Sequence, residues 1–210
     1  MIRLLIFSCL SLTVLLGACN NQSKNTPSKE TGPRLFTLLS PEQTHVNFSN
    51  TLTEGPNTNV MMYEYFYNGG GVAIADLNGD DLDDIYFTAN MADNKLYLNK
   101  GNMQFDDITA QAGVQNRKAP WRTGVTIADI NGDGKRDIFV SYSGKVRGEN
   151  RMSQLFINTG NDANAVPHFE EQAQQFGLAD SSYSTQSYFF VFYRDGDLDM
   201  YLNNYLLSSR

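Results

Sequence analysis

The chain has 210 residues, of which 41% are hydrophobic, 12% aromatic and 19% charged. This composition is typical of a packed globular protein and excludes a wholly disordered chain. The formal charge is −7, from 16 Lys and Arg against 23 Asp and Glu, and no basic cluster occurs, so we expect no nucleic-acid partner. We expect no zinc cage of Cys and His, because the chain contains only two Cys and two His. Abundant Gly, Asn and Asp favour a turn-rich β fold.

The N-terminus has the pattern of an export signal. Arg3 precedes an apolar run over Leu4–Leu16, which is too short to span a bilayer as a helix. The run ends in Leu-Gly-Ala-Cys19, which resembles the lipobox of bacterial lipoproteins. That resemblance implies a signal peptide over residues 1–18, a lipidated Cys19, and a lipid-anchored protein of the bacterial cell envelope, at the outer membrane. The alternative is an ordinary signal peptide with a chance Cys.

Behind the signal, the chain divides by composition. Residues 19–33 contain almost nothing apolar and are predicted to be a flexible tether. No second apolar stretch approaches membrane-spanning length, so we expect membrane contact through the lipid anchor only. Residues 34–66 form a lead-in segment, and residues 67–210 contain an internal repeat.

The repeat predicts an all-β fold. GVAIADLNGDDLDDIYFTAN from Gly71 recurs as GVTIADINGDGKRDIFVSYS from Gly124, and a third copy begins near Ser184. Within each unit, short runs rich in β-branched residues alternate with Asn-Gly and Asp-rich turns, and KLYLN and QLFIN follow as third strands. A unit of 50–60 residues with about four short strands is typical of a β-propeller blade. We therefore expect a partial β-propeller of about three blades.

An acidic loop separates the first two strands of each unit. Oxygen-bearing side chains recur at loop positions 1, 3, 5 and 9, and position 7 would offer its backbone carbonyl. Hard cations such as Ca²⁺ bind six to eight such oxygens. The predicted calcium ligands of the first loop are Asp76, Asn78, Asp80, the Leu82 carbonyl and Asp84, and those of the second are Asp129, Asn131, Asp133, the Lys135 carbonyl and Asp137.

Ordinary hairpin turns are the alternative for these loops, because Asn-Gly and Asp-Gly between apolar strands favour hairpins without a metal. A turn alone does not require acids at positions 1, 5 and 9. Carboxylates crowded together would also repel one another without a cation. An EF-hand is excluded, because position 12 is Phe87 or Val140 where that motif has Glu.

The D-x-N-x-D-G-x-x-D loop between two strands, repeated with apolar flanks, resembles the FG-GAP/VCBS repeat family. The resemblance implies blades of an integrin-α-like β-propeller with calcium in the loop between strands. It also implies that three blades are an N-terminal fragment of a seven-bladed propeller. At position 6 the first loop departs from the family, since Asp81 stands where the family has Gly. The lead-in segment, followed without a break by the end of the run YEYFYNGGG from Tyr63 to Gly71, resembles that of bacterial VCBS-repeat lipoproteins.

The third loop departs further. Alignment on its Asp-Gly-Asp-Leu-Asp run puts Val191 at position 1 and Tyr193 at position 3. The remaining acids are Asp195, Asp197 and Asp199. Two of the four side-chain ligand positions are lost, so a third calcium site is doubtful.

The sequence predicts no catalytic residue. It contains no G-x-S-x-G, H-E-x-x-H or P-loop pattern. We expect a non-catalytic calcium-binding scaffold that binds a glycan or a protein. The alternative is an accessory or N-terminal part of a larger carbohydrate-active or other exported enzyme. Trp121 and the aromatics from Tyr63 to Tyr67 are expected to pack between blades, although a sugar-stacking platform is the alternative.

Overall fold

A computed structural model describes residues 35–117, 121–144 and 148–205. The chain divides into two units, Met1–Leu38 and Leu39–Arg210, and every helix and strand of the described residues lies in the second. The predicted signal peptide over residues 1–18, the tether over 19–33 and Cys19 lie outside the described residues. Among the residues that are described, no helix is long and apolar enough to cross a membrane.

The first sheet contains four antiparallel strands in sequential order. Its strands are β1 (Val72–Ala75), β2 (Asp84–Phe87), β3 (Lys95–Asn99) and β4 (Phe105–Asp107). Each strand pairs with the next along the chain, as hairpins of alternating apolar and polar residues do. All four lie where the repeat pattern predicts them.

The second sheet repeats this topology. Its strands are β5 (Arg122–Ala128), β6 (Asp137–Tyr142), β7 (Gln154–Asn161) and β8 (Pro167–Glu171), again in sequential order. The connection between β6 and β7 is longer than that between β2 and β3, so the repeat offset grows from 53 residues (Gly71 to Gly124) to 59 residues (Leu96 to Leu155). The hairpin between β7 and β8 is also longer than its counterpart in the first sheet.

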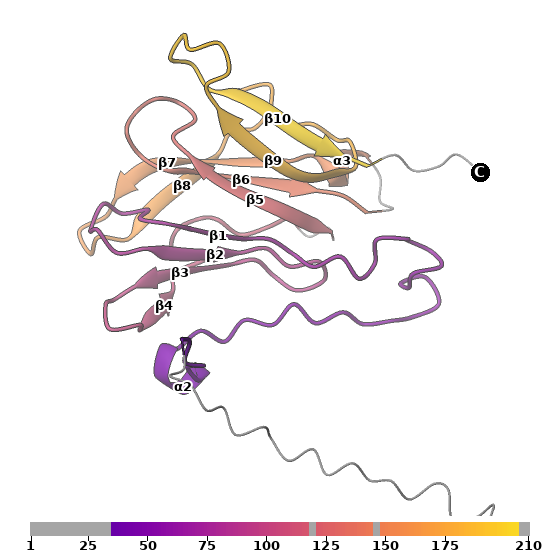
Figure 1. The fold of residues 1–210 in the computed structure, drawn as a ribbon, viewed down its shortest axis with the longest axis horizontal. Coiled ribbons are helices and arrows are strands. Elements are labelled where there is room, and N and C mark those ends of the chain that lie inside the picture. Colours follow the sequence, from indigo (N-terminus) through magenta and orange to yellow (C-terminus); the bar gives the residue numbers. More distant parts are fainter. Residues whose placement is uncertain (1–34, 118–120, 145–147, 206–210) are drawn as a thin grey trace, which may run out of the picture. The chain divides into compact units, whose positions relative to one another are not determined.

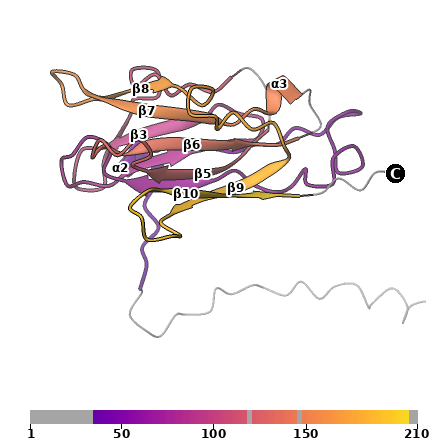
Figure 2. The same cartoon turned by 90° about the horizontal axis from the view of Figure 1, so that it is seen from above.

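The third sheet holds one hairpin, β9 (Ser184–Phe190) and β10 (Asp199–Asn204). The described residues contain only two α-helices, α2 (Pro41–Thr44) and α3 (Gly148–Arg151), each of four residues. The prediction of an all-β fold is therefore confirmed for the residues that the structure describes. Figure 1 shows the three sheets lying face to face, and Figure 2 shows them from above.

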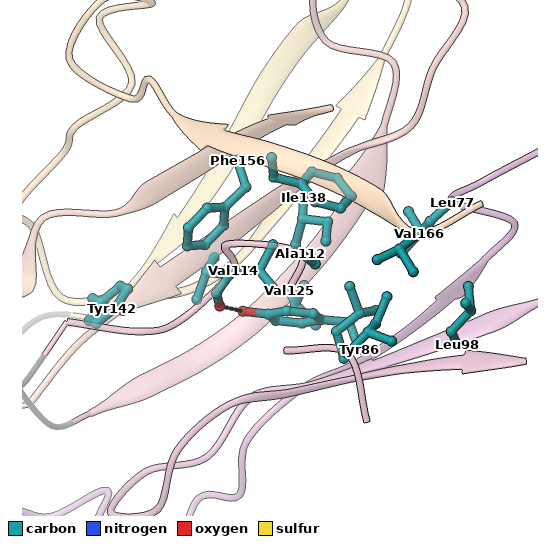
Figure 3. Packing of buried hydrophobic residues seen from close by; sticks show 14 residues of the cluster. Leu77, Tyr86, Leu98, Ala112, Val114, Val125, Ile138, Tyr142, Phe156 and Val166 are labelled. Carbon is teal, nitrogen blue, oxygen red and sulfur yellow. Dashed lines mark hydrogen bonds between the residues drawn. The ribbon is translucent and has the colours of Figure 1, made fainter. Parts of the chain in front are cut away.

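The second sheet is buried on both faces, and β6 shows the reason in its sequence. Successive strand residues point to opposite faces. Ile138, Val140 and Tyr142 pack toward the first sheet, in a cluster with Tyr86 and others (Figure 3). Phe139 points the other way, where it packs with Leu155 and Ile157 and against Phe189, Met200 and Leu202 of the third sheet. A strand with apolar residues on both faces therefore belongs between two other sheets.

The lead-in segment covers part of the first sheet. Phe48 stacks on Phe87 of β2 with ring centroids 4.6 Å apart. The Asn50 side chain donates to Asn90 Oδ1 at 2.8 Å and accepts from the Asn90 backbone N–H at 2.9 Å. Val72 and Ile74 of β1 stay exposed. Tyr63, Phe66 and Trp121 pack together as a buried aromatic cluster, so for these three residues the expectation of packing holds.

Two adjacent glycines before β1 offer a matched test of this packing. A Cβ at Gly70 would overlap the carbonyl oxygen of Thr88 and lie 2.7 Å from its carbonyl carbon, whereas a Cβ at Gly69 would meet nothing within 4 Å. We expect Gly70→Ala to lower the free energy of unfolding by about 1–3 kcal/mol, the usual cost of overpacking. Gly69→Ala is the control, with an expected change within about 0.5 kcal/mol. Urea unfolding of both variants would check this, and equal effects would contradict it.

Candidate metal centre

Each acidic loop is the connection of a hairpin. Residues 76–84 join β1 to β2, and residues 129–137 join β5 to β6. The last acid of each loop, Asp84 or Asp137, is also the first residue of the second strand and is fully buried. The predicted ligands of each loop are therefore held within a single tight turn, and the ligands of the two loops stand at equivalent places in two sheets.

The carboxylate at position 1 of each loop accepts backbone N–H groups from the loop itself. Asp76 accepts from Gly79 at 2.7 Å, Asp80 at 3.2 Å and Asp81 at 2.8 Å. Burial alone would raise the pKa of Asp76, but these hydrogen bonds outweigh it and hold the pKa below its usual value. Asp129 accepts in the same way from Asp133 at 3.0 Å and Gly134 at 2.8 Å.

Positions 3, 5 and 7 also repeat. Asp80 accepts from the Leu82 N–H, and Asp133 accepts from the Lys135 N–H, both at 2.9 Å. The side-chain amide of Asn78 donates to Asp80 at 3.0 Å, as that of Asn131 does to Asp133 at 3.1 Å. The backbones of Leu82 and Lys135, whose carbonyls are predicted ligands, are thus tied to the neighbouring acid.

The buried acid at position 9 ties the loop to the sheet. Asp84 accepts from Leu77 N–H at 3.0 Å and from Asn99 N–H on β3 at 2.8 Å. Asp137 accepts from Ile130 N–H and from Asn158 N–H on β7, both at 2.8 Å. Burial, together with the charges of Asp80 and Asp76, raises the pKa of Asp84 to about 6 despite these bonds. Burial also raises the pKa of Asp137.

The backbone at position 6 is left-handed in both loops. Asp81 has φ 64° and Gly134 has φ 84°, so the first loop adopts the family-like turn without the glycine. A left-handed conformation disfavours any residue with a Cβ.

We therefore expect Asp81→Gly to stabilise the first loop by about 1 kcal/mol, through relief of this strain and removal of one of several crowded charges. Gly134→Asp in the second loop is the matched reverse change and should destabilise by a similar amount. Thermal unfolding without added metal would measure both. A stabilising Gly134→Asp would contradict the strain argument.

The third loop keeps the shape of the others without their full set of acids. Phe192 N–H at position 2 donates to Asp199 at position 9, at 2.8 Å, and Asp197 N–H at position 7 donates to Asp195 at position 5, at 3.2 Å. The other two loops form bonds between the same positions. Gly196 at position 6 has φ 95°, and Arg194 at position 4 has φ 59° where the other loops have glycine. The loop conformation therefore does not depend on the Asp at position 1 or the Asn at position 3.

The fit of these residues to a metal ion rests on their donor chemistry. Three carboxylates and one amide within nine residues are donors that Ca²⁺ prefers. Within the described ranges, however, no three or more Asp, Glu, His or Cys side chains are gathered as a ready metal cage. Each acid already accepts backbone N–H groups, so a calcium ion would draw on oxygens that the loop itself holds in place. The backbone bonds also give the acids a structural role that the sequence pattern alone did not reveal.

The two loops differ in charge. The first contains five Asp and no cation between residues 76 and 84, which gives −5. The second contains three Asp with Lys135 and Arg136, which gives −3 + 2 = −1, and Lys135 forms an ion pair with Asp133 at 2.6 Å. A cleft of about 720 Å³ lies between the loops, lined by Asp76, Asn78 and Asp83 on one side and by Lys135 and Arg136 on the other. A cation, if bound, would therefore relieve more charge repulsion in the first loop than in the second.

Comparison with known proteins agrees with this repeat structure. Residues 76–140 match the FG-GAP-like repeat family. The matched segment begins with the first acidic loop and ends just after the second, so both predicted metal loops lie within the matched segment.

Two curated relatives share part of the chain. Cartilage acidic protein 1 of Mus musculus is 39% identical over 70 residues, which are 33% of this chain and 11% of that protein. Cartilage acidic protein 1 of Xenopus tropicalis is 32% identical over 102 residues, 48% of this chain and 16% of that protein. The chain therefore spans about 11–16% of the length of these relatives.

Two further residues, which the pattern of acids did not indicate, belong to the candidate site. Asn99 and Asn158 stand at the ends of KLYLN and QLFIN, and their backbone N–H groups bind the position 9 acids. Their signal in the sequence is an Asn at the same place in both repeats.

Proposed function

We propose that the FG-GAP-like region is a calcium-stabilised, non-catalytic scaffold. The proposal rests on one observation: the same acidic loop occurs in the equivalent hairpin of two sheets. In both loops, side chains at the same positions accept hydrogen bonds from backbone N–H groups at the same positions. The ions would be held by Asp76, Asn78, Asp80, Asp84 and the Leu82 carbonyl, and by Asp129, Asn131, Asp133, Asp137 and the Lys135 carbonyl. Bound calcium would neutralise the crowded carboxylates and cross-link each hairpin.

We also propose that the three sheets are blades of a β-propeller. Supporting this, the first strands of the sheets, β1, β5 and β9, lie next to one another, as the inner strands of blades do. The outer faces of the end sheets expose apolar residues, namely Val72 and Ile74 on β1, and Tyr188, Phe190 and Tyr201 on the third sheet. Such faces are suited to further sheets of the same kind. The role of the scaffold would be to bind a glycan or a protein at the cell envelope, with Cys19 as its lipid anchor.

Calorimetric titration with calcium tests the metal sites. We expect two ions per wild-type chain with dissociation constants of roughly 10⁻⁴–10⁻³ M, the range of extracellular calcium modules. Asp133→Asn, which retains an oxygen for the Lys135 N–H, should leave one ion per chain. A folded wild-type chain that binds no calcium at millimolar concentration would refute the proposal. Incorporation of labelled palmitate into the wild type but not into Cys19→Ser would test the anchor.

A further inference from the structure

Asn158 contacts both acidic loops. It lies in β7 and is 1% exposed. Its backbone N–H donates to Asp137 Oδ1 at 2.8 Å, and its side-chain amide donates to the Arg136 carbonyl at 3.2 Å, so it is fixed to the second loop. The same amide donates to the Leu77 carbonyl of the first loop at 2.9 Å. One buried side chain therefore joins loops that lie in different sheets.

The contact reaches the buried acid of the first loop in one further step. Leu77, whose carbonyl accepts from Asn158, donates its own N–H to Asp84 Oδ2 at 3.0 Å. Asp84, Asp137, Asn158 and Leu77 are all buried. A short run of buried hydrogen bonds therefore connects the two position 9 carboxylates. Hydrogen bonds of this kind are stronger and more directional in a buried setting than at the surface.

The hairpin that carries Asn158 makes a second connection to the first loop. The Asn161 side chain donates to the Asn78 carbonyl at 2.6 Å, and the Asn78 side chain donates to the Ala165 carbonyl at 3.1 Å. The β7–β8 hairpin, which is longer than its counterpart in the first sheet, thus holds position 3 of the first loop as well as the carbonyl at position 2.

Asn99 supplies an internal comparison. Its backbone N–H donates to Asp84 and its side-chain amide donates to the Asp83 carbonyl, both at 2.8 Å, and its Oδ1 accepts from Gly101 N–H at 2.9 Å. These bonds match those of Asn158 to Asp137, Arg136 and Gly160. Of these two asparagines, only Asn158 adds a bond to the loop of another sheet.

We propose that Asn158 is a positioning residue that couples the two calcium loops, so that an ion in one raises the affinity of the other. The inference rests on the calcium binding proposed above. An ion in the second loop would hold Asp137 in place. Asp137 in turn fixes Asn158, and Asn158 fixes the Leu77 peptide whose N–H binds Asp84. By linkage the effect is reciprocal.

Calcium titrations followed by the NMR amide signal of Gly79 would report the affinity of the first loop. Disabling the second loop with Asp133→Asn should weaken calcium binding at the first loop by about fivefold or more, the lower range of allosteric couplings. In an Asn158→Ala background, Asp133→Asn should change that affinity by less than about twofold. The Asn99→Ala background is the control and should keep the full fivefold effect.

The outcomes separate the two proposals. A residue that only stabilised the sheet would lower the melting temperature in Asn158→Ala and leave the fivefold effect intact, and that result would overturn the coupling. So would a first-loop affinity that is indifferent to Asp133→Asn in the wild type. No calcium response at Gly79 or Gly132 would overturn the proposed function and the coupling with it.

Asn161→Ala provides a second variant in case Asn158→Ala does not fold, because Asn161 is exposed and its side chain makes only one bond to the first loop, at Asn78. In the Asn161→Ala background we expect Asp133→Asn to weaken calcium binding at the first loop by only about 2.5-fold, half of the fivefold effect in the wild type. An unchanged effect would count against the role of the hairpin and overturn the proposed route.

Discussion

Calcium at about 10 mM is expected to raise the free energy of unfolding by roughly 1.4–2.7 kcal/mol for each occupied loop, hence by about 3–5 kcal/mol in total. The figure follows from mass action with dissociation constants of roughly 10⁻⁴–10⁻³ M, since a ligand that binds only the folded chain stabilises it by RT ln(1 + [L]/Kd). Thermal unfolding in calcium and in excess chelator would measure it. Magnesium is the control, because it keeps its water ligands more tightly and should stabilise less.

The charge difference between the loops makes this prediction sharper. Asp80 lies in a loop of net charge −5, so without metal Asp80→Asn should relieve repulsion and leave stability unchanged or slightly higher. With calcium the same change should be destabilising, because it removes a ligand. Asp133 instead has Lys135 as an ion-pair partner, so Asp133→Asn should lower stability slightly even without metal. Equal behaviour of the two variants in both conditions would contradict the argument.

If the melting curve did not depend on calcium, the acids would need another role, and the hydrogen bonds of the loops suggest one. Positions 1, 5 and 9 all accept backbone N–H groups, and the third loop keeps its turn with Val191 and Tyr193 in place of two ligands. Under that outcome the acids would be turn-forming residues. The melting experiment therefore distinguishes two physical reasons for the same sequence pattern.

The sequence predicts the strands well because two signals coincide. The apolar runs have the period of strands, and the turns between them contain Asn-Gly or Asp-Gly, so the position of each hairpin follows from local chemistry. The repeat then predicts which strands share a sheet. Asp81 departs from the glycine expected at position 6, and it still adopts the left-handed turn with φ 64°.

The contacts between sheets were harder to predict because they depend on pairs of residues far apart in the chain. The bond from Asn158 to Leu77 spans 81 positions, and nothing near either residue indicates the other. The backbone roles of the acids were missed for another reason. A carboxylate that binds a metal and one that binds backbone N–H groups need the same residue at the same spacing, so the pattern alone does not separate the two.

Truncation of Phe139 is expected to be strongly destabilising. Its side chain is fully buried and lies between the second and third sheets, 5.6 Å from the Phe189 ring in an edge-to-face arrangement. Removal of a buried Phe side chain costs about 3–5 kcal/mol, because the transfer free energy is lost and a cavity remains. Phe139→Ala should therefore lower the melting temperature by about 10 °C in a chain of this length.

Phe192→Ala is the matched control, because Phe192 is a 64% exposed aromatic in the loop that joins β9 to β10. Its expected effect is within about 0.5 kcal/mol. Phe139→Leu should recover most of the lost stability, because it refills much of the cavity. If the third hairpin did not pack on the second sheet, Phe139 would be exposed on that face. Phe139→Ala would then cost no more than Phe192→Ala, so the ratio of the two effects tests the stacking of the sheets directly.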